Sequence, residues 1–258
     1  MSVKKLLDLS GKVAVVTGGS RGLGLQIAEA LGEMGARLAL TARKKDELNS
    51  AVVHLGNQGI EAVPFVCDIG RREQLAPFAE DAMKLFKKID ILVNNAGATW
   101  GAPAETHSLD AWDKLVSVNM SGLFALTQIV ARKSMIPAKW GRIVNVASVA
   151  GLMGQDPRFA ATAAYTATKH GVVGLTRQLA AEWGVHGITV NAICPGFFPS
   201  KMTRATLETA GKLIQEWTPT RRLGGDEDLK GLAVLLASEA SRHITGQAIA
   251  VDGGATIV

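Results

Sequence analysis

Short, continuously apolar runs alternate along the chain with longer stretches in which apolar residues recur every three or four positions. The apolar runs, which we read as strands, lie at 13–17, 37–42, 62–68, 90–97, 142–148, 188–196 and 246–254. The periodic stretches, which we read as helices, lie at 23–35, 44–59, 71–88, 108–137, 162–183 and 226–238. Strands that are apolar on both faces and separated by helices are typical of a buried parallel sheet. The pattern therefore predicts an α/β protein with a seven-stranded parallel sheet and helices on both faces.

One domain accounts for this pattern, because no linker, repeat or low-complexity block interrupts residues 1–258. We therefore expect a single doubly wound domain of the Rossmann type. The least regular segment, at about 197–222, follows the sixth predicted strand. Ligands bind beyond the carboxyl ends of such strands, so we expect this segment to form a substrate lid.

Composition and charge narrow the function classes. The chain is 47% hydrophobic and 20% charged, an ordinary composition for a soluble globular protein. A net charge of +5 favours acidic ligands such as phosphorylated cofactors. The Lys and Arg residues are scattered without interleaved aromatics, so we do not expect nucleic-acid binding.

The chain gives no sign of membrane insertion, secretion or metal binding. No apolar run approaches the ~18 residues of a membrane span, and the first residues lack a signal peptide's apolar core and cleavage site. We therefore expect a cytoplasmic protein without a membrane partner. The histidines do not pair with Cys, Asp or Glu at ligand spacings, so no metal is expected.

The turn after the first strand, TGGSRGLG at 17–24, fits two different motifs. G-x-S-x-G would present Ser20 as a nucleophile, whereas T-G-x-x-x-G-x-G would bind the phosphates of a dinucleotide. A nucleophile elbow takes an oxyanion-hole amide from an earlier loop, and only one strand precedes Ser20 here. We therefore assign the turn to phosphate binding. The residues expected to contact a dinucleotide are Gly18, Ser20, Arg21, Gly22, Leu23 and Gly24.

The end of the second predicted strand indicates which dinucleotide. An Asp or Glu there would bind the ribose 2′-hydroxyl of NAD, but the sequence reads Thr41-Ala42-Arg43. The Arg43 guanidinium suits a 2′-phosphate, and Arg21 could join it. The alternative is that Arg43 is a solvated charge, although a cation is unfavourable at a helix N-terminus. The sequence favours NADP(H) over NAD(H).

Tyr165 is the only tyrosine, and Lys169 follows it by one helical turn. A free phenol has a pKa of about 10 and is a poor acid–base group at neutral pH. A neighbouring ammonium favours the phenolate and lowers that pKa, which makes Tyr165 a candidate general acid–base. By itself, however, the pair is more typical of an ordinary tyrosine and an exposed lysine.

Further polar residues accompany this pair. Ser148 closes one predicted strand, NNAG closes another at 94–97, and Asn119 lies inside a predicted helix, where Asn is costly unless its amide makes hydrogen bonds. With TGGSRGLG, CDI, VNMSG, YTATK, NAICPG and VDGG, the set resembles the classical short-chain dehydrogenase/reductase family from about residue 10 to 254.

The resemblance implies a role for each matching position. Tyr165 would exchange a proton with the substrate oxygen, and Ser148 would hydrogen-bond that oxygen. Lys169 would lower the pKa of the phenol and bind the nicotinamide ribose, while Asn119 would hold a water linked to Lys169. The other residues implied to contact the cofactor are Asp68, Ile69, Asn95, Ala96, Gly97, Pro195, Gly196, Phe198 and Ser200.

The sequence departs from the family at two places. Ser148 and Tyr165 are 17 positions apart, more than is typical, so the intervening loop should bulge toward the substrate and bring Arg158 and Phe159 with it. Ser200 stands where the family often has a Thr that holds the nicotinamide carboxamide, and it keeps the hydroxyl.

The expected substrate residues are Trp100, Arg158, Phe159 and Met202. An apolar slot with a cationic mouth suits an acyl thioester on a phosphate-bearing carrier, although these residues could instead pack the lid or a neighbouring subunit. The chain resembles both 3-oxoacyl-thioester reductases and gluconate 5-dehydrogenases. We expect the former activity, with a sugar-acid or polyol dehydrogenase as the alternative.

A non-catalytic NADPH sensor or scaffold is a third hypothesis, and the complete set of four polar residues argues against it. The resemblance also implies a homotetramer or homodimer that packs through the predicted helices at 108–137 and 162–183 and the last predicted strand.

Overall fold

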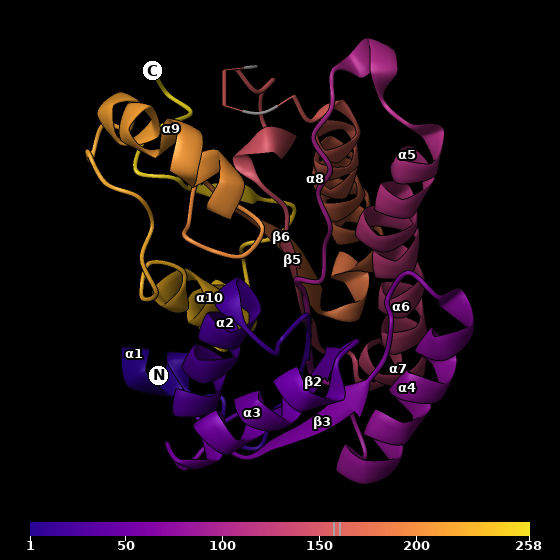
Figure 1. Cartoon of the computed structure of the whole chain (residues 1–258). Coiled ribbons are helices and arrows are strands. Elements are labelled where there is room, and N and C mark those ends of the chain that lie inside the picture. Colours follow the sequence, from indigo (N-terminus) through magenta and orange to yellow (C-terminus); the bar gives the residue numbers. More distant parts are fainter. Residues whose placement is uncertain (157, 160) are drawn as a thin grey trace.

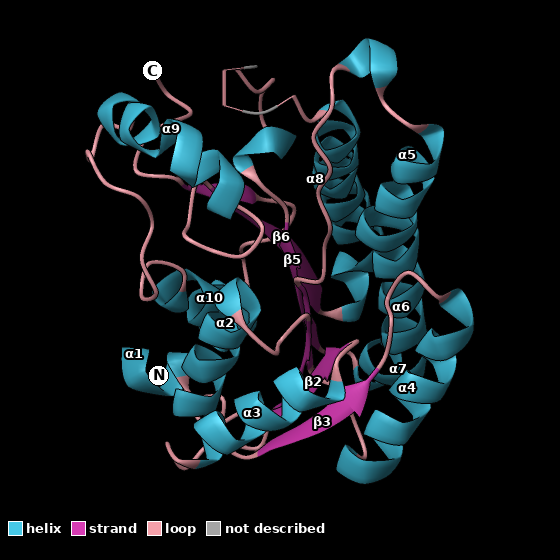
Figure 2. Ribbon diagram, viewed as in Figure 1, coloured by secondary structure: helices cyan, strands magenta, loops and turns pink. Residues whose placement is uncertain are grey.

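A computed structural model describes residues 1–156, 158–159 and 161–258. Seven parallel strands form one sheet in the order β3-β2-β1-β4-β5-β6-β7, which confirms the predicted sheet (Figure 2). The strands are β1 (Val13–Thr17), β2 (Arg37–Ala42), β3 (Ala62–Val66), β4 (Ile91–Asn94), β5 (Gly141–Val146), β6 (Ile188–Pro195) and β7 (Ala248–Val251). The helices are α1 (Val3–Leu7), α2 (Gly22–Glu33), α3 (Lys45–Gly56), α4 (Arg72–Phe86), α5 (Leu109–Val116), α6 (Leu123–Val130), α7 (Ile136–Ala138), α8 (Ala163–Trp183), α9 (Arg204–Trp217) and α10 (Lys230–Ala237).

Helices cover both faces of the sheet, as the apolar strands require (Figure 1). On one face, α2, α3 and α10 pack against the alternate strand residues that include Val16 and Leu40. On the other face, α4, α6 and α8 pack against the intervening residues, including Val15 and Leu92. Every residue of β1 is buried, and alternate residues of this strand belong to the two cores.

The helix predicted over 108–137 is one continuous stretch from Leu109 to Ala138 with two π-helical turns. It is long and apolar enough, by length and composition alone, to cross a membrane, although 44% of its apolar window is buried inside the protein. Its buried residues recur every three or four positions at Leu115, Asn119, Leu123 and Leu126. Since the stretch packs against α4 and α8, its apolar character serves the protein core.

The segment expected to be irregular, about 197–222, contains the 14-residue helix α9. This helix was missed in the prediction, although Leu207, Ala210, Ile214 and Trp217 recur at helical spacing; only Ala210 and Ile214 are buried. The short helix α1, which buries none of its residues, was also not predicted from the sequence. Figure 1 shows α9 beyond the carboxyl end of β6, over the same edge of the sheet as the loop after β5.

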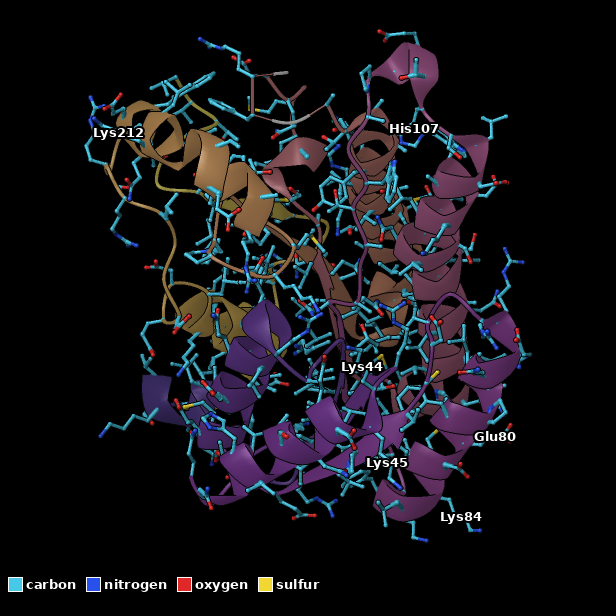
Figure 3. All side chains as sticks on the ribbon, viewed as in Figure 1. Lys44, Lys45, Glu80, Lys84, His107 and Lys212 are labelled. Atoms are coloured by element: carbon cyan, nitrogen blue, oxygen red, sulfur yellow. The ribbon has the colours of Figure 1, made fainter. Side chains whose placement is uncertain are left out.

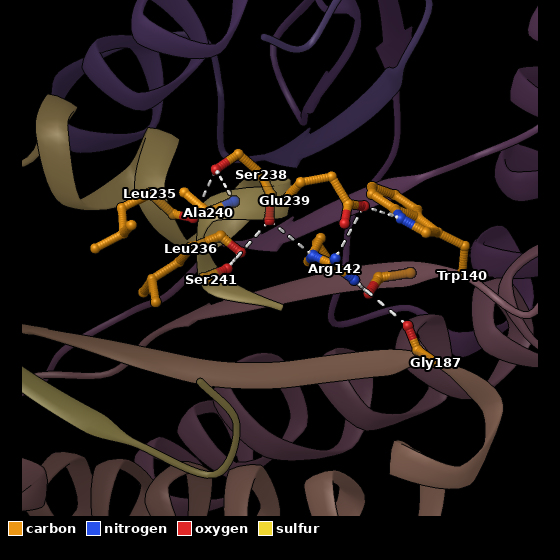
Figure 4. A network of polar contacts seen from close by, with 10 residues as sticks. Trp140, Arg142, Gly187, Leu235, Leu236, Ser238, Glu239, Ala240 and Ser241 are labelled. Carbon is orange, nitrogen blue, oxygen red and sulfur yellow. Dashed lines mark hydrogen bonds and ion pairs between the residues drawn. The ribbon is translucent and has the colours of Figure 1, made fainter. Parts of the chain in front are cut away.

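A polar network pins the opposite, amino-terminal end of β5 (Figure 4). The Arg142 side chain is 3% exposed, and its Nε donates to the Ser238 carbonyl at 3.0 Å while its Nη2 lies 3.2 Å from Glu239 Oε1. Its guanidinium carbon lies 4.4 Å from the ring centroid of Trp140, whose Nε1 donates to the same Glu239 oxygen. The network joins β5 to the turn that follows α10.

Candidate active site

The glycine-rich turn has the backbone that a phosphate cradle needs. Gly18 has φ +64°, a conformation that L side chains rarely adopt. A Cβ on Gly24 would lie 2.3 Å from the Gly18 carbonyl oxygen and 2.4 Å from Nδ2 of Asn95. Asn95 Nδ2 donates to the carbonyls of Thr17 and Gly18 at 2.9 and 3.1 Å, so the end of β4 holds the turn in place.

A cavity of about 470 Å³ starts at this turn and follows the carboxyl ends of the strands. The strand order reverses between β1 and β4, which is where open α/β sheets bind ligands. Every residue expected to contact the cofactor lines this cavity: Gly18, Ser20, Arg21, Gly22, Leu23, Gly24, Arg43, Asp68, Ile69, Asn95, Ala96, Gly97, Tyr165, Lys169, Pro195, Gly196, Phe198 and Ser200. Its shape and its glycine cradle fit an extended dinucleotide.

Several charged residues that the motifs did not single out as cofactor contacts also line the cavity. Lys44 and Glu47 lie where β2 leads into α3, Lys114 comes from α5, and Lys201 comes from the segment after β6. Figure 3 shows Lys44 over the middle of the molecule, beside the start of α3. The only sequence signal for Glu47 is its place in the first turn of a helix, where an acid is favourable for any helix.

Ser148, Tyr165 and Lys169 come together at the far end of the cavity. Ser148 follows β5 in an extended conformation, and its hydroxyl accepts a hydrogen bond from Ala150 N at 3.1 Å. Lys169 Nζ donates to the Val146 carbonyl at 2.8 Å and lies 5.5 Å from the ring centroid of Tyr165. One helical turn of α8 thus presents both side chains to the end of β5.

Burial favours the uncharged forms of both groups on α8. Desolvation raises the pKa of the Tyr165 phenol, and a hydrogen bond with Ser148 opposes that rise. Desolvation also lowers the pKa of Lys169 from 10.5 to about 8. The sequence predicted that Lys169 lowers the pKa of the phenol; here the pKa of Tyr165 is raised, and burial of the phenol is the largest cause.

Asn119 lies in the π-helical turn Ser117–Gly122 and is 1% exposed. Its Oδ1 accepts from Ala98 N at 2.9 Å, and its Nδ2 donates to the Ala98 carbonyl at 2.9 Å and to Thr168 Oγ1 at 3.0 Å. These bonds explain the Asn inside a helix, because its amide fixes the chain after β4 against α8. The water-holding role of Asn119 stays a prediction.

Beyond β6, a hydroxyl pair shapes the wall expected to face the nicotinamide. Ser200 Oγ lies 2.9 Å from Thr203 Oγ1, and Thr203 Oγ1 donates to the Phe198 carbonyl at 2.6 Å. Thr203 lines the cavity beside Ser200, although the sequence analysis did not select it. The departure from the family at Ser200 therefore leaves two hydroxyls in this wall.

The structure brings only one of the four expected substrate residues, Met202, into the cavity wall. Arg158 is bound through its Nε and Nη2 by the carboxylate of Asp156, outside the described lining. Phe159 packs edge-on against Phe197 and at a tilt against Trp217. Trp100 is 56% exposed and also lies outside the described lining.

The arrangement suits proton exchange with an oxygen at the end of a dinucleotide cavity. It offers a phenol and a hydroxyl in contact, with a buried amine behind them. Across residues 1–156, 158–159 and 161–258, no group of three or more His, Cys, Asp and Glu side chains could hold a metal ion.

Known proteins resemble the chain over its whole length. A model of the short chain dehydrogenase family matches residues 12–211. The gluconate 5-dehydrogenase of Gluconobacter oxydans is 39% identical over 261 residues, which cover 100% of this chain and 99% of that protein. The 3-oxoacyl-(acyl-carrier-protein) reductase FabG of Pseudomonas aeruginosa is 37% identical over 248 residues, covering 96% and 98%.

Among solved structures, a gluconate 5-dehydrogenase from Burkholderia cenocepacia in complex with NADP and tartrate superposes with a TM-score of 0.94. It is 34% identical, and the match covers 100% of both chains. The match includes the strands and turns that build the cavity. The chain therefore belongs to the short-chain dehydrogenase family and is an NAD(P)-dependent oxidoreductase that acts on alcohol and ketone groups.

Proposed function

We propose that the enzyme interconverts a ketone and a secondary alcohol with NADP(H), and that its substrate is a 3-oxoacyl thioester. The observation that supports this reaction is that Ser148, Tyr165 and Lys169 line the same cavity as the glycine-rich turn. The complete set of polar residues argues against a non-catalytic sensor or scaffold.

Each side chain has a distinct part in the proposed reaction. When bound, the nicotinamide cofactor supplies the chemistry of hydride transfer. The Tyr165 hydroxyl donates a proton to the substrate oxygen during reduction and takes it back during oxidation. Ser148 hydrogen-bonds that oxygen as charge develops, and Lys169 binds the cofactor's ribose beneath the phenol.

The preference for NADP(H) rests on the charge at the cavity end formed by the turn and β2. Arg21, Arg43 and Lys44 line that end, and the end of β2 carries no acid. Guanidinium groups bind phosphate oxygens in a fork geometry, so these residues suit a 2′-phosphate. The bound NADP in the Burkholderia cenocepacia structure is consistent with this assignment.

Changing Arg43 to Asp tests the cofactor assignment. Arg43→Asp should lower kcat/KM with NADPH by at least about tenfold and leave NADH use much less affected, because a positive charge that attracts the 2′-phosphate becomes a negative charge that repels it. Steady-state assays with each cofactor measure the ratio. An unchanged ratio would show that Arg43 does not contact the 2′-phosphate.

Aromatic side chains pack together beside the cavity, which favours an acyl chain over a polyol. Phe159, Phe197 and Trp217 pack together beyond the cavity, and Met202 lines it. A polyol would need several polar groups to hold its hydroxyls. The names of the Gluconobacter and Burkholderia relatives support a sugar acid instead, so this second candidate function has to be tested directly.

Parallel assays distinguish the two substrates. Purified protein is supplied with NADPH and either acetoacetyl-CoA or 5-ketogluconate, and absorbance of the reduced cofactor is followed. A higher kcat/KM with acetoacetyl-CoA supports the thioester assignment. A higher value with 5-ketogluconate overturns it and assigns the enzyme to sugar-acid metabolism.

We also propose a cytoplasmic homotetramer or homodimer. Leu109, Trp112 and Phe124 are exposed apolar residues on the stretch Leu109–Ala138, which is one of the expected packing surfaces. Sedimentation velocity would give the assembly state.

A further inference from the structure

Glu47 joins two segments of the cavity wall. It lies in the first turn of α3 and lines the cavity. Its Oε2 is 3.3 Å from Arg21 Nε, and its Oε1 is 3.2 Å from Lys44 Nζ. Arg21 belongs to the glycine-rich turn, whereas Lys44 follows β2. One carboxylate therefore connects the two segments that would surround the adenosine half of a dinucleotide.

The surroundings of Glu47 keep its carboxylate charged. A hydrogen bond from Lys44, together with the charges of Arg21, Lys44 and Lys201, holds the pKa of Glu47 below its usual value. Glu47 is thus an anion at neutral pH and binds a guanidinium and an ammonium group. A 2′-phosphate is also an oxyanion, and it would bind the same kinds of group.

We infer that Glu47 competes with the cofactor's 2′-phosphate for Arg21 and Lys44 and so limits the enzyme's preference for NADP(H) over NAD(H). This inference rests on the proposed cofactor assignment. The Glu47 carboxylate lies against both cations, offsets part of their positive charge and would repel a 2′-phosphate bound beside them, whereas a 2′-hydroxyl carries no charge to be repelled. Glu47 is then a specificity-determining residue that opposes the cations beside it.

Asp46 provides a matched control for a Glu47 variant. It is the neighbouring acid in the same first turn of α3, it is exposed, and it lies outside the described cavity lining. Asp46→Asn and Glu47→Gln each remove one negative charge from the same helix end. Both variants therefore lose the same kind of interaction with the helix dipole, and only Glu47→Gln frees Arg21 and Lys44.

The experiment measures the Kd of NADPH and of NADH by titration calorimetry for the wild type, Glu47→Gln and Asp46→Asn. Glu47→Gln should tighten NADPH binding about three- to tenfold, the range expected when partly exposed ion pairs no longer compete. Its affinity for NADH should change little. Asp46→Asn should change either affinity by less than about twofold, and added salt should shrink the gain in Glu47→Gln.

Three results would overturn the inference. Weaker NADPH binding in Glu47→Gln would mean that the carboxylate positions the cations for the phosphate. A loss confined to NADH would mean that Glu47 accepts a hydrogen bond from the 2′-hydroxyl. An equal gain in Asp46→Asn would mean a general charge effect.

The ratio of the Kd values of NADPH and NADH in the wild type tests the proposed cofactor preference separately. A wild type that binds NADH more tightly contradicts that preference, while the change from wild type to Glu47→Gln still decides the role of Glu47.

Discussion

Tyr165 and Lys169 occupy protein surroundings that shift both groups toward their uncharged forms. Lys169 is 5% exposed, and its Nζ donates to a backbone carbonyl at 2.8 Å. At the scale of the residue, the sequence spacing correctly placed the two side chains on one face of α8. It could not give their protonation, because desolvation depends on the strands and loops packed around them.

Removing the Tyr165 hydroxyl should abolish turnover while the cofactor still binds. Tyr165→Phe keeps the ring beside Lys169 but removes the group that exchanges the proton, so kcat should fall by about 10²–10⁴-fold or more. NADPH affinity and the Tm of the same variant serve as controls and should stay close to wild type. Retained turnover would exclude Tyr165 as the acid–base group.

The low pKa of Lys169 predicts how stability depends on pH. The pKa of Lys169 is about 8 in the native protein and 10.5 in the unfolded chain. At a pH between these two values, the unfolded chain binds more protons at this site than the native protein does. The contribution of Lys169 to the free energy of unfolding should therefore increase as the pH rises through about 8.

Tm measured from about pH 7 to 9 for the wild type and Lys169→Met tests this linkage, since groups present in both proteins cancel. The difference, wild type minus variant, should grow with pH. A flat difference would mean that the native pKa of Lys169 is not depressed.

At the scale of the element, the turn from β1 into α2 depends on close backbone approach. The glycine pattern in the sequence indicated a phosphate turn, and the structure adds the reason for Gly24, whose missing side chain makes room for Gly18 and Asn95. Asn95 comes from a strand 77 positions away from Gly18, so no local pattern could show that contact.

Gly24→Ala should distort this turn. A Cβ 2.3 Å from a carbonyl oxygen forces a backbone shift, which we expect to weaken NADPH binding by at least about tenfold and to cost about 1–3 kcal/mol of stability. Calorimetric titration and urea unfolding measure the two effects.

Gly231→Ala in α10 is the matched control, because a Cβ there has no neighbour within 4 Å in the described structure. It should leave binding unchanged and stabilise the helix by up to about 1 kcal/mol. Equal effects of the two variants would contradict the steric argument.

Across the whole molecule, one end of the sheet carries the site and the opposite end carries a network that stabilises the fold. The carboxyl end of β5 leads to Ser148, and its amino end is held by Arg142, Glu239 and Trp140 (Figure 4). Desolvation lowers the pKa of Arg142, and the carboxylate of Glu239 opposes that change. The network connects segments about a hundred positions apart and fixes the sheet without touching the cavity.

Arg142→Met should therefore reduce stability without changing cofactor binding. Loss of the guanidinium removes the hydrogen bond to the Ser238 carbonyl, the ion pair with Glu239 and the contact with the Trp140 ring, at a cost of about 2–4 kcal/mol. Urea unfolding measures the loss. Arg132→Met, at an exposed position, should change stability by no more than about 0.5 kcal/mol. A large loss of NADPH affinity in Arg142→Met would contradict the separation of the two ends.

Local patterns in the sequence were enough to predict the parallel sheet, the glycine-rich turn and the cofactor-contact residues that line the cavity. These features follow from local patterns: apolar runs, helical periodicity and motifs whose glycines and hydroxyls serve one backbone geometry. The helix α9 has an apolar repeat at helical spacing, so the sequence carried that signal and the prediction missed it. The three-dimensional arrangement was needed to show that Arg158 is bound by Asp156 outside the described lining and that Glu47 holds Arg21 and Lys44. Ion pairs and burial depend on which segments meet in space, and the spacing of residues along the chain does not contain that information.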